Sequence, residues 1–222
     1  MQVSEAVARR KSVRAFLDDR VAAERLAPLI ESAGRAASGG NLQPWHVTLL
    51  TDGGMERFRA MMSARIASGR VDSPDYPLYH SPLAEPYRSR RFDVGEAKNA
   101  RRGFPREDKA KRLDWFARNY RFFDAPAGLF LSVERDMGAA QWTDLGGFLA
   151  TLMLLIVEDG LASCPQEAWV VHHRAVADFI DMPDSQMLFC GLAIGHPDPN
   201  AEVNGLETAR APVEEWLKTL SE

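Results

Sequence analysis

The stretch SGGNLQPWHVTLL, from Ser38 to Leu50, joins a glycine-rich loop to a strand-like run. From His46 to Thr51 apolar and polar residues alternate, as they do in a half-buried β-strand. Before that run, Ser38, two glycines and Asn41 precede Gln-Pro-Trp. A simple turn into a strand would not need Ser, Asn and Gln together. Glycine has no side chain, so its backbone can approach another group closely. The stretch therefore predicts a strand preceded by a loop that holds something; the alternative is a glycine-rich entry into a hairpin with a buried Trp.

Helical and strand-like segments follow one another along the rest of the chain without a regular βαβ alternation. Apolar spacing predicts helices at about 4–11, 21–38, 54–69, 106–119, 139–159 and 172–180, and from Pro212 onward. Strands are predicted at 46–51, at 186–195, and after a turn at 124–126 up to residue 134. This mixture favours the α+β class.

Three residues indicate where the predicted helices begin or end. Ser4 is a good N-cap for the first helix. Pro28 fits only near the start of the second helix, because a later proline loses a backbone hydrogen bond. Gly160 follows the long helix at the position where glycine commonly ends one.

Residues 70–105 differ from the rest of the chain. Prolines at positions 74, 77, 82 and 86 interrupt regular structure, and aromatic residues are scattered among them. The pattern predicts a long irregular excursion, and loops of this length in a folded domain are often functional.

The composition is that of an ordinary soluble globular protein. The 222 residues are 45% apolar and 26% charged, with a net charge of −4, so a nucleic-acid partner is not expected. The longest apolar run, Leu145 to Val157, would span about 20 Å as a helix, short of the ~30 Å hydrocarbon core of a bilayer. It predicts a buried helix rather than a membrane span. The N-terminus also lacks the apolar region of a signal peptide.

The cysteines, the histidines and the known catalytic motifs do not indicate acid–base catalysis by side chains of this protein. Cys164 and Cys190 have no metal-ligand spacing and are interpreted as buried free thiols in a reducing cytosol. The histidines, interpreted as surface or capping residues rather than metal ligands, are His46, His80, His172, His173 and His196. The chain contains no Rossmann fingerprint, P-loop, nucleophile elbow or HExxH motif. If the protein is an enzyme, a cofactor is expected to carry the chemistry.

The segment RRKSVRAF, Arg9 to Phe16, places Arg10, Ser12 and Arg14 at alternate positions. In an extended segment alternate residues point the same way, so two guanidinium groups and a hydroxyl would form a cradle for a phosphate or a polar chain. The alternative is a solvated basic turn.

Four blocks in this order and spacing resemble the FMN-dependent nitroreductase family. They are RKSVR (residues 10–14), SGGNLQPW (38–45), the segment 160–167 with Pro165-Gln166, and the segment 191–195 followed by Arg210. The resemblance covers essentially the whole chain except about 70–120, where the family is variable. Within the family, SCPQEAW and FFDAPAGL look most like the branch that reduces nitrobenzoates and other nitroaromatics.

The resemblance implies a nitroreductase-like fold, with a central, mostly antiparallel sheet flanked by helices. It implies one domain over residues 1–222, with a variable substrate-capping excursion at about 70–120. It also implies a domain-swapped homodimer with two FMN sites at the interface.

The resemblance also assigns roles to particular residues. Arg10, Ser12, Arg14 and Arg210 would bind the phosphate, with Lys11 contributing its backbone. Ser38, Gly39 and Asn41 would reach the flavin edge from the partner subunit. Pro165, Gln166 and Glu167 would lie against the isoalloxazine ring, and Gly191 would also belong to the cofactor site. No catalytic side chain and no metal are expected, because the chemistry takes place at flavin N5.

The function implied is reduction of nitroaromatic compounds with electrons from NAD(P)H by a ping-pong mechanism, in the cytoplasm. Three alternatives remain open. The protein could be another flavin reductase of the same fold, such as a quinone or enone reductase, a dehalogenase or a flavin-cleaving enzyme. It could also be a non-catalytic flavin-binding dimer, or a structural dimer without a cofactor. The sequence names neither the nitroaromatic nor the choice between NADH and NADPH.

The segment from Tyr87 to Arg112 is basic within an acidic chain, with ten Lys or Arg against four acids. It is either a solvated helix face or a surface that steers an anionic ligand. Aromatic residues flank it and could wall a flat substrate, although some must be core residues. The candidates for the substrate pocket are Tyr87, Phe92, Trp115, Tyr120 and Phe122.

Overall fold

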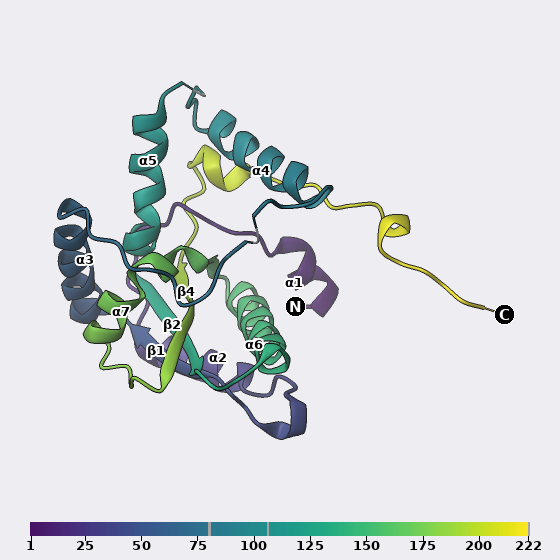
Figure 1. The fold of residues 1–222 in the computed structure, drawn as a ribbon, viewed down its shortest axis with the longest axis horizontal. Coiled ribbons are helices and arrows are strands. Elements are labelled where there is room, and N and C mark those ends of the chain that lie inside the picture. Colours follow the sequence, from purple (N-terminus) through teal and green to yellow (C-terminus); the bar gives the residue numbers. More distant parts are fainter. Residues whose placement is uncertain (80, 106, 222) are drawn as a thin grey trace.

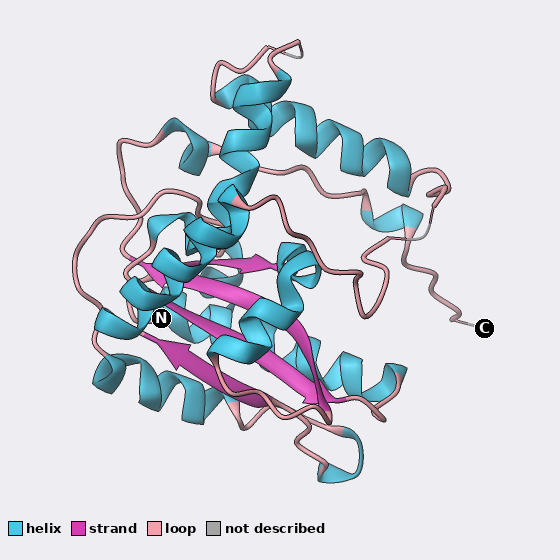
Figure 2. Ribbon diagram, turned by 60° about the vertical axis from the view of Figure 1, so that its left-hand side comes forward, coloured by secondary structure: helices cyan, strands magenta, loops and turns pink. Residues whose placement is uncertain are grey.

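The computed structural model describes residues 1–79, 81–105 and 107–221; His80 and Arg106, the first residue of the helix predicted at about 106–119, lie outside the described residues. Its centre is a four-stranded sheet in the order β1-β2-β4-β3, and each neighbouring pair is antiparallel. The strands are β1 (His46–Leu50), β2 (Ala127–Glu134), β3 (Ala162–Gln166) and β4 (Gln186–Gly195). Helices cover both faces of this sheet (Figure 2), which confirms the predicted α+β arrangement.

The helices are α1 (Val3–Arg9), α2 (Ala23–Ala33), α3 (Asp52–Ala67), α4 (Tyr87–Arg101), α5 (Lys109–Ala117), α6 (Ala139–Glu158) and α7 (His173–Phe179). Short 3₁₀ segments lie at Gly39–Asn41, Arg118–Asp124, Glu167–His172, Glu202–Gly205 and Val213–Glu215. In Figure 1, α6 lies on one side of the sheet, α3 and α7 lie on the other, and α4 and α5 extend above it.

Two hydrophobic cores form because β2 is buried on both faces. Leu129 and Leu131 point into one core with α2 and α6, and Phe130 points into the other with α3. In a strand, successive side chains face opposite sides, so a fully buried strand reads as a continuous apolar run. Each such side chain contributes roughly 1.5–3 kcal/mol on burial.

The second core is aromatic. Phe58, Phe122, Phe130 and Trp169 contact one another with ring centroids 4.9–5.7 Å apart. Tyr120, 8% exposed, joins them at 5.6 Å from Trp169, and Phe122 is 0% exposed. Tyr120 and Phe122 are therefore part of the core of the chain, and their predicted place in a substrate pocket stays a prediction.

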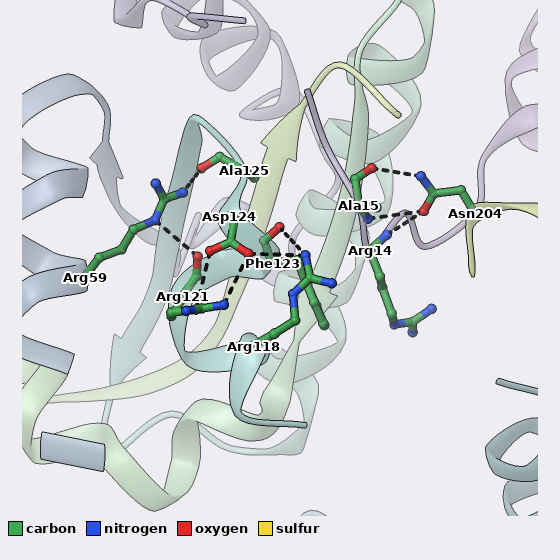
Figure 3. A network of polar contacts seen from close by, with 9 residues as sticks. All are labelled: Arg14, Ala15, Arg59, Arg118, Arg121, Phe123, Asp124, Ala125 and Asn204. Atoms are coloured by element: carbon green, nitrogen blue, oxygen red, sulfur yellow. Dashed lines mark hydrogen bonds and ion pairs between the residues drawn. The ribbon is translucent and has the colours of Figure 1, made fainter. Parts of the chain in front are cut away.

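The turn before β2 directs these aromatic side chains inward. Phe122, Phe123 and Asp124 all have positive φ, between 53° and 64°, which is unusual for residues with side chains. Asp124 accepts from Arg118 Nη2 at 3.2 Å, and the Arg59 guanidinium donates to the Ala125 carbonyl (Figure 3). Arginine donors on both sides of the turn thus stabilise a strained backbone that places Phe122 in the core.

The excursion contains more regular structure than its prolines predict. Residues 70–105 include α4, a helix of 15 residues. Pro86, the last of the four prolines, occupies the N-cap position of α4, and no proline follows within the helix. The proline-rich stretch therefore ends where the helix begins, and residues 87–101 were wrongly included in an irregular segment.

The C-terminal helix predicted from Pro212 is wrong. Only Val213–Glu215 form a short 3₁₀ turn. The segment runs away from the body in Figure 1, and Trp216, Leu217 and Leu220 are 70%, 56% and 80% exposed. Apolar spacing alone does not stabilise a helix that has nothing to pack against.

Helix α6 is only partly the buried helix that was predicted. Leu145, Phe148, Leu152 and Ile156 form one buried stripe. The helix is long and apolar enough to cross a membrane by composition, yet only 22% of its apolar window is buried within the chain. The outer face of α6 is thus apolar and partly exposed.

Of the three residues predicted to mark helix ends, only Gly160 matches the structure: it follows α6 with φ of +79°, as predicted. Gln2, and not Ser4, is the N-cap of α1, and Pro28 lies inside α2 on its exposed side. His172 and His173, interpreted as surface or capping residues, are buried at 3% and 5% exposure, while Cys164 and Cys190 are buried free thiols as predicted. Within the described residues no group of His, Cys, Asp or Glu could hold a metal ion.

Candidate functional site

A cavity of about 1230 Å³ lies between the excursion and the end of β3. Its floor is Pro165, Gln166, Glu167 and Ala168, which include the residues that the resemblance assigns to the ring of the cofactor. Its walls include Leu78, Tyr79, Leu83, Arg88, Arg91, Phe92, Lys98, Phe116 and Asn119, all from residues 70–120. The excursion thus covers the third block of the sequence.

The floor of the cavity offers polar atoms beside an apolar wall. Gln166 Nε2 donates to the Asn119 carbonyl at 2.7 Å, whereas the buried Gln166 Oε1 has no partner among the described residues. Partial burial raises the pKa of the Glu167 carboxyl. An unpartnered buried acceptor is costly, so a ligand that donates to Gln166 Oε1 would recover that free energy.

The first block runs alongside the start of β3. Ser12 forms an isolated parallel bridge with Ser163, and Val13 N donates to the Ser163 carbonyl at 3.0 Å. Val13 is buried while Ser12 and Arg14, on either side of it, remain partly exposed, as expected for an extended segment. Arg10 ends α1 with extended backbone, and Lys11 is exposed. The first and third blocks are therefore brought together.

Asn204 fixes the backbone of the first block. Its Oδ1 accepts from Arg14 N at 2.9 Å and from Ala15 N at 3.2 Å, and its Nδ2 donates to the Ala15 carbonyl at 2.8 Å (Figure 3). The same Nδ2 donates to the Asp198 carbonyl at 3.0 Å. This buried amide thus sets the position from which the Arg14 side chain extends.

We expect Asn204→Ala to lower the free energy of unfolding by about 2 kcal/mol, because it leaves buried backbone groups without partners. Urea denaturation of the cofactor-free protein measures this effect. Asn200→Ala is the control: Asn200 is exposed, and its loss should change stability by less than about 0.5 kcal/mol. Equal stability of the two variants would show that the Asn204 hydrogen bonds contribute nothing.

The second block lies at the other end of α6. Gly39 N donates to the Asp144 carboxylate at 3.2 Å, near the start of the helix. The N-terminal amine of Met1 pairs with Glu158 at 3.1 Å, at its end. Fourteen helical residues separate these two anchors, which is about 20 Å at ~1.5 Å per residue. The structure thus anchors the second block near the start of α6 and the N-terminus of the chain at its end.

Two further residues of the predicted site lie in unexpected surroundings. Gly191 is buried on β4, where an added Cβ would stand 2.4 Å from Trp169 Nε1, so we assign it a packing role. Arg210 is exposed beyond Asn204, and its guanidinium donates to Thr208 Oγ1 at 2.6 Å and to the Ala209 carbonyl at 3.1 Å. Among the described residues, the hydrogen bonds of the Arg210 guanidinium go to Thr208 and Ala209 and not to the first block.

Of the predicted pocket residues, Phe92 lines the cavity. Tyr87 is 61% exposed, with the Arg90 guanidinium 6.0 Å from its ring centre. Trp115 is half-buried beneath the Arg102 guanidinium, which lies 3.8 Å from its ring centre. Sequence reasoning missed Phe116 and Asn119 as wall residues, and only the basic surplus of the segment pointed to Arg91 and Lys98.

Comparisons with known proteins agree with this geometry. Residues 7–196 match the model of the nitroreductase family. The chain is 34% identical over 206 residues to a 4-nitrobenzoate reductase of Pseudomonas putida, covering 92% of this chain and 89% of that protein. It is 46% identical to the crystal structure of the FMN and NADPH-dependent nitroreductase NfnB from Sphigopyxis sp. strain HMH, with a TM-score of 0.95 and 100% of both chains covered. NfnB from Mycobacterium smegmatis in complex with NADPH has 28% identity and a TM-score of 0.92, covering 99% of this chain and 100% of that one.

Proposed function

Because the chain belongs to the nitroreductase family, we propose that it is an FMN-dependent oxidoreductase that reduces nitroaromatic compounds with electrons from NAD(P)H. The observation that carries this proposal is the cavity over Pro165, Gln166 and Glu167, with the first block beside the same strand. When bound, FMN would supply the redox chemistry, namely acceptance of a hydride from NAD(P)H and two-electron reduction of the nitro group.

The residues present fit FMN. A phosphate needs cations, and Arg10, Ser12 and Arg14 lie beside the start of β3, with the Lys11 backbone between them. The polar ribityl chain needs hydrogen-bonding partners, and Ser163 Oγ and Gln166 Oε1 are buried atoms without partners among the described residues. The flat ring needs an apolar surface to lie against, and Pro165 provides one on the cavity floor.

The side chains of this protein position the reactants rather than transfer protons. Phe92 and Phe116 on the walls offer aromatic surface against which a flat substrate can pack. Arg91 and Lys98, on the same walls, attract anionic reactants. The cavity over Pro165, Gln166 and Glu167 supports a ping-pong order, in which NAD(P)H and the nitroaromatic use it in turn. Residues 70–120 act as its substrate-capping excursion within one domain.

The complete site requires a homodimer. Gly39 is held near the start of α6, whereas the first block lies beside Ser163, which follows the end of that helix, so we infer that a second copy brings its Ser38 loop to the cofactor. The partly exposed outer face of α6 and the exposed apolar residues of the C-terminal segment would be covered by that copy. Sedimentation should then give about twice the 24.7 kDa mass of the chain. We place the enzyme in the cytoplasm, where NAD(P)H is available.

The visible absorption spectrum of the purified protein tests the function. We expect the two bands of oxidised flavin, their loss on anaerobic addition of NADPH, and their return when a nitroarene is added. Bands that persist with NADPH would indicate a flavin-binding protein without turnover. A colourless protein, even after incubation with FMN, would contradict the proposal.

A further inference from the structure

Three cations lie near one another where the end of α4 approaches Asn204: Arg101 Nη1, in the last turn of α4, is 3.3 Å from the position of a Cβ added at Gly205, and Asn204 holds the Arg14 backbone. Lys98 is on α4, Arg102 directly follows that helix, and Arg14 belongs to the first block. Burial lowers the pKa of Lys98, and the nearby Arg14 and Arg102 lower it further. The pKa of Arg102 falls to about 10, through burial and through Arg14, Arg112 and Arg118. These cations repel one another, and in residues 1–79, 81–105 and 107–221 no carboxylate pairs with any of the three.

Arg102 is held rigidly in this cluster. Its guanidinium lies 3.8 Å from the Trp115 ring centre and 5.0 Å from that of Phe104. Its Nε donates to the Lys98 carbonyl at 2.8 Å, and its Nη2 donates to Asn99 Oδ1. Its Nη1 is buried and has no partner in the described part of the chain. A buried charged donor without an acceptor is costly, so the geometry favours an anion at this position.

A hydroxyl group without a partner lies beside the same cluster. Ser163 is 1% exposed, and its Oγ has no hydrogen-bond partner among the described residues. The Ser163 carbonyl accepts from Val13 N, one residue before Arg14. Lys98 lines the same cavity as Pro165 and Gln166, the last two residues of β3, so α4 lies close to that strand. The Arg14 guanidinium donates to the Ser12 carbonyl at 3.2 Å, whereas Arg102 Nη1 and Ser163 Oγ are buried without partners among the described residues.

We propose that Lys98 and Arg102 join Arg14 in binding the phosphate monoester of FMN, so that α4 of the capping excursion is part of the cofactor site. This inference rests on the proposed function and adds two residues to its phosphate site. A phosphate monoester carries up to two negative charges and three acceptor oxygens, which suits a cluster of cations with free donors. The 2′-phosphate of NADPH has the same chemistry, and the experiment must separate the two sources.

FMN and riboflavin differ only in the phosphate, so their affinities isolate its contribution. The cofactor-free protein is titrated with each flavin and followed by quenching of flavin fluorescence. Lys98→Gln and Arg102→Met should each raise the Kd for FMN about tenfold or more, while the Kd for riboflavin changes less than about twofold. Lys109→Gln, which removes one charge from exposed α5, is the matched control and should change neither affinity.

Other outcomes would overturn the inference in distinct ways. If affinity for FMN and affinity for riboflavin fall equally, the cluster is structural. A lowered melting temperature that Arg102→Lys does not restore would mean the same. If the variants bind FMN with unchanged affinity but lose a lower KM for NADPH than for NADH, the cluster binds the 2′-phosphate of NADPH instead. If the unmodified protein binds neither flavin, the proposed function itself fails and the inference fails with it.

Discussion

A Gly191→Ala variant is expected to lose about 3 kcal/mol of unfolding free energy, because the core has no room for one more methyl group. An added Cβ would stand 2.4 Å from Trp169 Nε1, 2.7 Å from Trp169 Cδ1 and 3.2 Å from Phe122 Cε1. Both rings are 0% exposed and contact each other at 4.9 Å. Neither ring can move away without displacing the rest of the aromatic core, and backbone on β4 cannot shift without breaking its pairing with β2 and β3.

Urea unfolding of the cofactor-free protein measures this loss. The control is Gly54→Ala in α3, where nothing lies within 4 Å of the added Cβ, and a gain of about 0.5 kcal/mol is expected in a helix. Unchanged stability of Gly191→Ala would contradict the packing role. A normal stability combined with lost FMN binding would instead restore the cofactor role that the resemblance implied for Gly191.

The sequence predicted those elements whose local pattern matches their surroundings. Residues 186–195 form β4 with the predicted bounds, because a short apolar run between glycines has few alternatives to a buried strand. Strand β3 was not predicted, since Pro165 lies within it. Its place at the end of the order β1-β2-β4-β3 explains this, because proline is tolerated at a sheet edge.

The candidate site divides in the same way. Residues 10–14 were predicted to be extended, which puts the side chains of Arg10, Ser12 and Arg14 on one side. The β-bridge between Ser12 and Ser163 agrees with an extended backbone. Lys98 and Phe116 could not be assigned, because their position depends on how the excursion folds back over β3. No local pattern encodes that packing. The same limit applies to Tyr120, whose burial is decided by its contact with Trp169, forty-nine residues away.

Arg14→Gln is expected to raise the Kd for FMN about 100-fold while riboflavin affinity changes less than about threefold. Asn204 holds the Arg14 backbone, so the substitution removes the charge without releasing the segment. Arginine can donate two parallel hydrogen bonds to a phosphate, and glutamine can replace neither the charge nor that geometry. Arg14→Lys, which keeps the charge but loses the fork, should lie between the two at about tenfold. Fluorescence titration of both flavins measures all three proteins.

The stability of the cofactor-free protein separates a binding role for Arg14 from a structural one. Arg14 lies near Lys98 and Arg102 and lowers the pKa of both, so its removal relieves repulsion. Without FMN, the Arg14→Gln variant should therefore be at least as stable as the unmodified protein. Bound FMN then stabilises only the protein that retains affinity. Arg9→Gln, which breaks an exposed pair with Glu5 on α1, should change neither property. If the cofactor-free variant is less stable and its affinities for FMN and riboflavin fall equally, Arg14 stabilises the fold and does not bind the phosphate.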